Sequence, residues 1–300
     1  MKAALLIGNG LNRCYANAIP WNKLLENIAQ KYGVTFNENN PFPLEFESIA
    51  NQIFSQDRGN AKTVYTELKS SIAQMVSNQT PSDGSLHELF AAHLPVDGIL
   101  TTNYDYMLER ALQQDHSLPT PKVQNISENK YSLYRFTNYA GKTFYHIHGE
   151  ANKPTSLCLG YEHYAGYLAK MREYLKAAPS IDQRISNVQL PEKPSWMNLF
   201  FTHDIYIVGL RLDTNEIDLW WLLTYRAYLY YSNDSQLKQI MKNRIKIFLT
   251  HDDPNQRELF HNLHVETELI EVHSKEDYEP TYRNIAQKIK LEISMREMVG

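Results

Sequence analysis

The sequence predicts an α/β fold: a Rossmann-like, doubly wound and mainly parallel sheet with an added helical subdomain. Short apolar runs end in glycine or in polar residues, as residues 3–7 do before Gly8, and such runs are typical of strands buried on both faces. Segments with apolar residues at helical spacing separate these runs. Because the two kinds of segment alternate along the chain, they favour a doubly wound sheet.

The individual elements follow from the same patterns. The expected strands span residues 3–7, 97–102, 205–208, 245–249 and 268–272. A hairpin over 131–147, with turn residues at 138–141, supplies a further strand whose second arm joins the sheet. Helices are expected after Pro20, over 46–54 and 64–76, from a capping box at Ser85 to Glu88, and from Tyr106. We expect one domain over 1–300 with helical insertions at about 35–95 and 161–200.

Composition excludes several functional classes. The chain has 30 Lys and Arg against 34 Asp and Glu, a net charge of −4, so we expect no direct nucleic-acid binding. No window contains the roughly 18 consecutive apolar residues that a membrane span needs. Two cysteines, Cys14 and Cys158, are too few for a four-cysteine zinc site. We therefore expect a soluble cytoplasmic chain without a structural metal.

Four loops that leave strands carry unusual polar content, namely residues 8–14, 101–105, 146–150 and 209–215. Ligands of open α/β sheets collect at the carboxyl ends of strands, so these loops should converge. Gly8 and Gly10 lack a Cβ and would let backbone N–H groups approach a pyrophosphate. The dinucleotide fingerprint would need glycine at position 13, where Arg13 stands instead, which favours an arginine that pairs with phosphate. A plain tight turn is the alternative explanation of the two glycines.

The loop over 101–105 contains Asn103 and Asp105, and the loop over 146–150 contains two histidines. Asp105 either caps the helix from Tyr106 or contacts a ligand. His146 and His148 point the same way if their strand continues, so they are candidate metal ligands or bases. No third ligand with convincing spacing follows, and a general base at His148, where the ligand loops gather, is the favoured interpretation. An ordinary buried histidine is the alternative.

Taken in order, these loops resemble the sirtuin-like domains of bacterial anti-phage defence proteins. The segment from Gly8 to Arg13, with Pro20 and Trp21 after it, is similar to the opening nucleotide loop of that family. Residues 101–105 resemble its asparagine motif and residues 147–149 its histidine motif. Residues 158–164 and 207–219 resemble its later segments, so the similarity spans about 5–225. Asn9 and Asn12 depart from the usual alanine and serine of the first loop.

The resemblance implies an NAD+ glycohydrolase that cleaves NAD+ to nicotinamide and ADP-ribose, with Asn103 and His148 as the catalytic residues. NAD+ is then the substrate, and no metal is expected. Sirtuin deacylases carry a four-cysteine zinc ribbon that this chain cannot build, which disfavours acyl-lysine substrates. The residues expected to bind NAD+ are Gly8, Asn9, Gly10, Asn12, Arg13, Thr102, Asp105, Gly209 and Arg211.

Three other functions stay open. They are a module that binds NAD or ADP-ribose without turnover, a zinc-independent protein deacylase or ADP-ribosyltransferase, and a structural assembly protein. The expected helix over 217–231 carries aromatic rings on more than one face. This predicts either a homo-oligomer or a helix enclosed by its own domain. The rings are those of Trp220, Trp221, Tyr225, Tyr228, Tyr230 and Tyr231. Because loss of NAD+ is lethal, we expect an oligomer or a separately encoded partner, such as a HerA-type ATPase or an Argonaute-like protein, to control activity.

Overall fold

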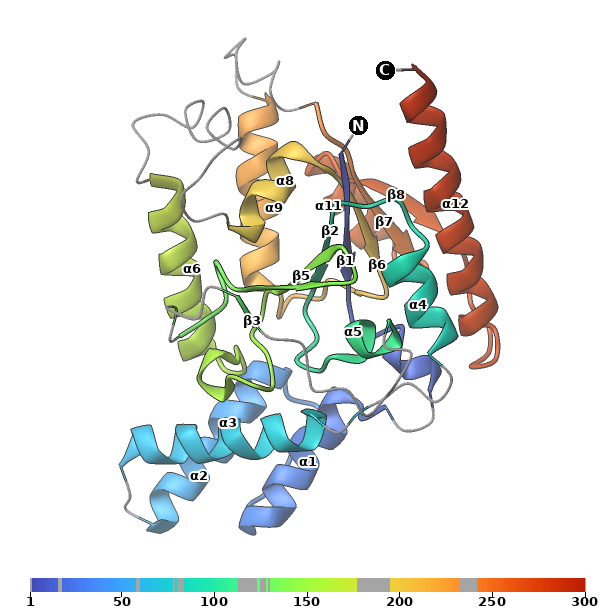
Figure 1. Ribbon diagram of the computed structural model, residues 1–300. Coiled ribbons are helices and arrows are strands. Elements are labelled where there is room, and N and C mark those ends of the chain that lie inside the picture. Colours follow the sequence, from blue (N-terminus) through green and yellow to red (C-terminus); the bar gives the residue numbers. More distant parts are fainter. Residues whose placement is uncertain are drawn as a thin grey trace.

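The core of the protein is an eight-stranded sheet with the strand order β3-β4-β5-β2-β1-β6-β7-β8 (Figure 1). The computed structural model describes residues 2–15, 18–57, 60–77, 79, 84–112, 123–124, 128, 130–176, 195–231 and 242–299. The strands are β1 (Ala3–Ile7), β2 (Gly98–Thr101), β3 (Val123–Gln124), β4 (Phe136–Tyr139), β5 (Lys142–His146), β6 (Asp204–Val208), β7 (Ile245–Leu249) and β8 (Glu266–Leu269). The pairs from β5 to β8 are parallel, and β3 and β4 are antiparallel. The predicted mainly parallel sheet is confirmed.

The direction of winding reverses beside β1. The chain passes from β1 to β2 and β5 on one side, and then returns to β6 on the other side. Ile7 at the end of β1 pairs with Thr101 of β2 and with Val208 of β6, and Thr101 pairs with His146 of β5. The four polar loops therefore leave the sheet at one edge, next to the switch point where open α/β sheets bind ligands.

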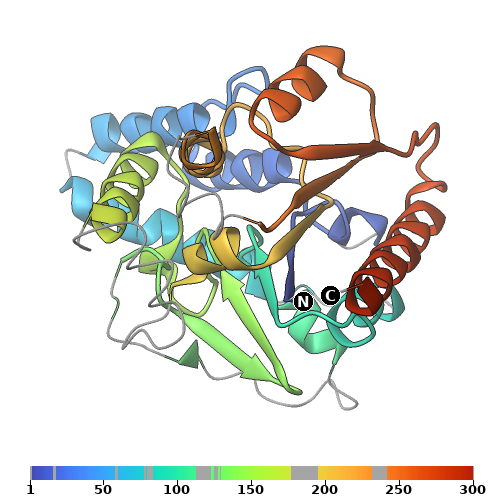
Figure 2. The same ribbon diagram turned by 90° about the horizontal axis from the view of Figure 1, so that it is seen from above.

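Helices cover both faces of the sheet because successive strand residues point to opposite faces. Leu6 belongs to the core that contains residues of α6 (Tyr161–Lys176), α8 (Leu199–Thr202), α9 (Ile217–Tyr231) and α11 (Pro254–Asn262). Leu5 and Ile7 belong to the core of the other face, formed with α4 (Ser85–Ala92), α5 (Met107–Ala111) and α12 (Tyr278–Val299). Figure 2 shows α12 and α4 side by side, away from α9.

A third core forms between the helices α1 (Trp21–Tyr32), α2 (Phe42–Asp57) and α3 (Ala61–Ser77). It includes Tyr104 and Tyr106, which follow β2, and Leu157 and Leu159, which follow β5. The three helices thus lie across the carboxyl ends of the strands, at the bottom of Figure 1. The limits of the two helical insertions stay a prediction, and residues 177–194 of the second lie outside the described residues.

Two local predictions differ from the structure. Ser85 is the first residue of α4 and Gly84 is its N-cap, without a side-chain cap bond, so the expected capping box does not form. The Ser85 hydroxyl instead accepts a hydrogen bond from Arg283 of α12 at 2.6 Å. The last strand spans Glu266–Leu269, two residues earlier than expected, and is only partly buried. In the part of the chain that the structure describes, no helix has the length and apolar character of a membrane span.

The aromatic side chains of α9 pack mostly within the domain. Trp220 stacks on Phe260 with 5.3 Å between ring centroids, and Tyr230 stacks on His264 at 3.7 Å. Tyr228 and Tyr231 are instead 73% and 59% exposed. The surplus aromatic surface is therefore limited to these tyrosines in the last turn of the helix, and assembly through α9 stays a prediction.

Candidate active site

The loops after β1 and β6 pack tightly against each other. The N–H of Gly8 donates to Val208 O at 3.0 Å, and that of Gly10 donates to Gly209 O at 2.8 Å. A Cβ on Gly8 would lie 2.6 Å from Gly209 O, and one on Gly10 would lie 2.6 Å from Gly209 Cα. Contact between these loops therefore requires the two glycines, and it occupies their N–H groups. The loop that they pack against lies about two hundred residues away in the sequence, and the pyrophosphate contact of Gly8 and Gly10 stays a prediction.

The other predicted NAD+ residues differ in accessibility. Arg13, in the 3₁₀ turn Asn12–Cys14, and Arg211, after β6, are exposed. Asn9 and Gly209 are half-buried, and Thr102 is buried. Gly209 has a φ of +64°, in the left-handed region that favours glycine. Among the residues expected to bind NAD+, Arg13 and Arg211 are thus the cationic side chains that an anionic group from solvent can reach directly.

Asn12 and Asp105 form a buried network that includes His87 of α4. Asn12 Nδ2 donates to Asp105 Oδ2 at 2.8 Å, and Asn12 Oδ1 lies 2.8 Å from His87 Nε2. Asp105 Oδ1 accepts from the Met107 N–H at 3.0 Å. Burial raises the pKa of Asp105, although these hydrogen bonds oppose the change. Asp105 therefore orders the loop at the start of α5 through its bonds to Asn12 and Met107, and its contact with NAD+ stays a prediction.

Asn103 lies at the end of β2 with 2% of its surface exposed. Its Nδ2 donates to Gly8 O at 3.3 Å, which fixes the orientation of the side-chain amide. The oxygen Oδ1 is buried and has no hydrogen-bond partner among the described residues. An unpartnered buried acceptor costs about 1–3 kcal/mol, so Asn103 Oδ1 is available to accept a hydrogen bond from a ligand or water.

His146 holds the backbone of Asn103 in place. Its Nδ1 lies 2.7 Å from Asn103 O and its Nε2 lies 2.9 Å from Glu109 Oε1. Burial alone would lower the pKa of His146, but Glu109, together with Glu150 and the carbonyl of Asn103, outweighs burial and raises the pKa to about 9. Both ring nitrogens are therefore protonated at neutral pH and donate these bonds. His146 acts on the site through Asn103.

His146 and His148 do not share a face, contrary to one sequence-based expectation. Strand β5 ends at His146, and the chain then turns, with the Gly149 N–H donating to His146 O at 3.0 Å. Gly149 has a φ of +97°, and a Cβ there would lie 2.5 Å from Ser156 O. The turn directs His146 toward Glu109 of α5 and His148 toward Asp218 of α9.

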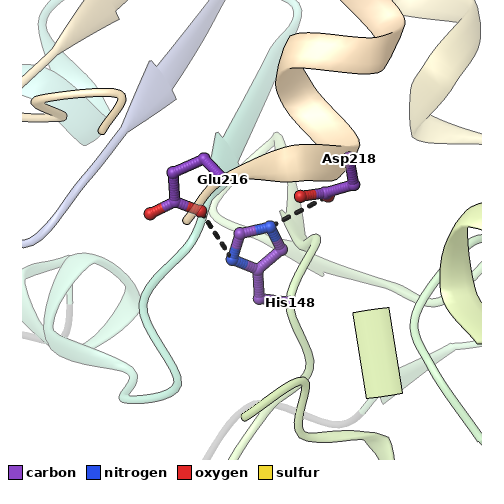
Figure 3. Close-up of side chains that lie close together, drawn as sticks. All are labelled: His148, Glu216 and Asp218. Carbon is purple, nitrogen blue, oxygen red and sulfur yellow. Dashed lines mark hydrogen bonds and ion pairs between the residues drawn. The ribbon is translucent and has the colours of Figure 1, made fainter. Parts of the chain in front are cut away.

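His148 lies between two carboxylates (Figure 3). Its Nε2 is 3.0 Å from Asp218 Oδ2, and its Nδ1 is 3.6 Å from Glu216 Oε2. Burial would lower the pKa of His148, but Asp218 and Glu216 together outweigh it and raise the pKa to about 9. Each ring nitrogen of His148 therefore faces a carboxylate oxygen, and the general-base role expected from the sequence stays a prediction.

Glu216 and Asp218 were not singled out from the sequence. They stand directly after the loop over 209–215, at the start of α9. Acidic residues in the first turn of a helix commonly interact with the helix dipole, so their positions alone carry no functional signal. Their contact with His148 spans about 70 residues of sequence and exists only in the folded chain.

His148, Glu216 and Asp218 are also possible metal ligands. One ligand atom from each lies within 4.8 Å of the others, and no other such group occurs among the described residues. The carboxylates face opposite nitrogens of one imidazole ring. A cation bound at Nε2 would displace the hydrogen bond to Asp218. In the structure the trio is an imidazole with a hydrogen bond to Asp218 and an ion pair to Glu216, and the expected absence of a metal stays a prediction.

The region from β2 to β7, which contains Asn103 and His148, matches a known protein family. A family model described as "SIR2-like domain" matches residues 97–266, which is more than half of the chain. The chain belongs to this family, and the resemblance seen in the sequence is confirmed. The match includes Asn103, His148, Glu216 and Asp218, whereas the loop after β1 precedes it.

A particular relative is "NAD(+) hydrolase ThsA" from Bacillus cereus (strain MSX-D12). The two proteins are 28% identical over 179 residues, which cover 59% of this chain and 34% of the relative. The chain thus matches about a third of the length of that protein.

Proposed function

We propose that this chain is an NAD+ glycohydrolase that converts NAD+ and water to nicotinamide and ADP-ribose. The observation that carries the proposal is the buried Asn103 amide at the carboxyl edge of a SIR2-like sheet, where its Oδ1 has no hydrogen-bond partner among the residues described. The printed name of the relative, an NAD+ hydrolase, supports the same reaction.

In the proposed reaction, the C1′–N bond of the nicotinamide riboside breaks and its electron pair leaves with nicotinamide. Positive charge then develops on the ribose, as in other glycoside cleavages. Asn103 accepts a hydrogen bond from a ribose hydroxyl or the attacking water, and the His148 imidazolium donates one from Nδ1. The exposed Arg13 and Arg211 pair with the pyrophosphate. No step requires a metal.

The biological setting is also part of the proposal. The similarity to defence-protein domains supports depletion of NAD+ during anti-phage (abortive infection) defence in the cytoplasm. A homo-oligomer, or a separately encoded partner such as a HerA-type ATPase or an Argonaute-like protein, would then keep the activity silent before infection.

The test measures NAD+ loss and nicotinamide release by HPLC with purified protein, alone and with the product of a neighbouring gene. Asn103→Ala and His148→Ala should each lower the rate by about 10²–10⁴, whereas Asn262→Ala and His261→Ala, exposed positions near the end of α11, should not. Circular dichroism checks that each variant folds. Nicotinamide release that requires an acyl-lysine or protein acceptor would instead identify a deacylase or transferase. Wild-type rates in the Asn103 or His148 variant would refute the proposed site.

A further inference from the structure

Glu216 differs from the other members of the trio in its access to solvent. The Glu216 side chain is 20% exposed, whereas those of His148 and Asp218 are 3% and 0% exposed. Its Oε2 is buried and has no hydrogen-bond partner within the part of the chain that the structure describes. It lies 3.6 Å from His148 Nδ1, too far for a good hydrogen bond. Glu216 is therefore the member of the trio that solvent reaches, and its inner oxygen Oε2 is an acceptor that a water bound beside His148 can use.

We propose that Glu216 is the general base of the reaction and takes a proton from the water that attacks C1′ of the NAD+ ribose. This inference rests on the proposed NAD+ hydrolysis. The water oxygen bonds to C1′ as the C1′–N bond breaks, neutral nicotinamide leaves with the bonding electrons, and the proton passes to the Glu216 carboxylate and then to solvent. Carboxylates perform this step in many enzymes that cleave glycosidic bonds.

The arrangement assigns distinct roles to the three side chains. His148 cannot readily take a proton, because Asp218 and Glu216 already hold it as an imidazolium. Asp218 is completely buried and bonds to the ring nitrogen that faces away from Glu216, so it is a positioning residue. His148 Nδ1 donates a hydrogen bond toward the Glu216 side of the ring, where it can orient the water beside the base.

The surroundings of Glu216 suit a base that works near neutral pH. Burial raises the pKa of Glu216 to about 7, the positive charge of His148 limits the rise, and Asp218 and Asp213 add to it. Glu216 is therefore ionised only above about pH 7, and the activity should rise with pH through that value. The titratable groups that interact with Glu216 come from four segments around it: His148, Asp218, Asp213, Tyr104, Tyr164 and Cys158.

The first experiment compares kcat/KM against pH for the wild type, Glu216→Gln and a control, Glu258→Gln. Glu258 is an exposed residue of α11. We expect Glu216→Gln to lower the rate by about 10²–10⁴ and to abolish the rise near pH 7, and we expect the control to keep both. Glu216→Gln should fold, because it removes the charge of a carboxylate that makes no hydrogen bond through Oε2 and leaves the His148–Asp218 hydrogen bond intact. Circular dichroism and the thermal unfolding midpoint check that the variant is folded.

The second experiment separates a base from a structural residue by chemical rescue. Azide is already an anion and needs no proton removed, so it should restore nicotinamide release to Glu216→Ala and yield 1-azido-ADP-ribose. Asp218→Ala should not be rescued, because Asp218 acts through His148. Chelation with EDTA should leave wild-type activity unchanged.

Each remaining outcome counts against the proposal. Wild-type kinetics in Glu216→Gln would overturn the base while leaving NAD+ hydrolysis intact. A slow variant that keeps the rise near pH 7 and is not rescued by azide would make Glu216 a structural residue. Activity lost in EDTA and restored by Zn²⁺ would make the trio a metal site. A wild type that releases no nicotinamide with or without its genomic neighbour would refute the proposed function, and the base with it.

Discussion

Asp218→Asn tests the charge interaction that holds His148. The substitution keeps the size of the side chain and removes the negative charge 3.0 Å from His148 Nε2. The folded protein raises the pKa of His148 from 6.5 to about 9, and each pKa unit corresponds to about 1.4 kcal/mol. The net stabilisation of the charged ring, after the cost of its burial, is therefore roughly 3 kcal/mol, and the two carboxylates are its source. Asp218 contributes more than Glu216, so we assign it about 2 kcal/mol of the total.

The sign of the pH dependence follows from linkage. Because the folded state raises the pKa of His148, the interaction stabilises the protein fully below about pH 6.5 and is lost as pH rises through about 9. The wild type should therefore be more stable than Asp218→Asn at pH 6 by about 2 kcal/mol. The difference in stability between the two proteins should shrink as pH rises from about 6.5 to about 9. It should vanish or reverse at higher pH, where a neutral imidazole faces the buried carboxylate of Asp218.

Urea unfolding of both proteins at a series of pH values measures this difference directly, because the titration of groups distant from Asp218 cancels in the comparison; Glu216, whose pKa Asp218 also raises, is the neighbouring group that does not. Asp213→Asn is the matched control, since Asp213 is exposed in the neighbouring loop and surface changes usually alter stability by less than about 0.5 kcal/mol. A stability difference that stays constant from neutral to alkaline pH would refute the reasoning, as would no difference at pH 6.

Three further predictions concern the frame of the site. Glu150→Gln should lower the free energy of unfolding in urea by about 3 kcal/mol, because it leaves the buried guanidinium of Arg135 without its anionic partner. Replacing Arg135 with Met in the same chain should recover most of this loss, and failure to do so would contradict the pairing. Gly8→Ala should lower the free energy of unfolding by about 1–3 kcal/mol and impair NAD+ cleavage, since the new Cβ would lie 2.6 Å from a backbone oxygen. Gly98→Ala is the control and should destabilise the protein less, because its Cβ would lie 3.2 Å from the flexible end of a leucine side chain. If the chain assembles through α9, light scattering should find an oligomer that Tyr228→Glu reduces toward the chain mass of 34.9 kDa, and a monomeric wild type would exclude this interface.

The fold was predictable where burial imposes a simple pattern. Strands β1, β2, β6 and β7 lie inside the sheet and are almost wholly buried, so their sequences are mostly apolar. Their expected positions agree with the structure within one residue. Strand β8 lies at the edge with residues such as Glu266 and Glu268 exposed or half-buried. Its sequence therefore lacks the continuous apolar run, and its position was predicted less well.

The candidate site was predictable only as far as single loops allow. Asn103 and His148 stand out because polar residues follow buried strands. Glu216 and Asp218 acquire their role from a histidine about 70 residues earlier, and Gly8 and Gly10 are required by Gly209 and by Tyr282 of α12. Such contacts depend on the tertiary structure, so a motif shows which residue is unusual without showing what it touches.

The charge of the trio bears on the reaction beyond proton transfer. With His148 protonated and both carboxylates ionised, the three side chains carry a net charge of −1, and with Glu216 protonated they carry none. Cleavage of NAD+ moves positive charge from the nicotinamide ring to the ribose, and a fixed negative charge in a site shielded from water stabilises such a cation strongly. If Glu216 is the base, the ionisation that enables it to accept a proton also creates the negative charge that the oxocarbenium-like state needs. Both effects then depend on one carboxylate, which is why we expect its loss to lower the rate and to remove the acid limb of the pH profile together.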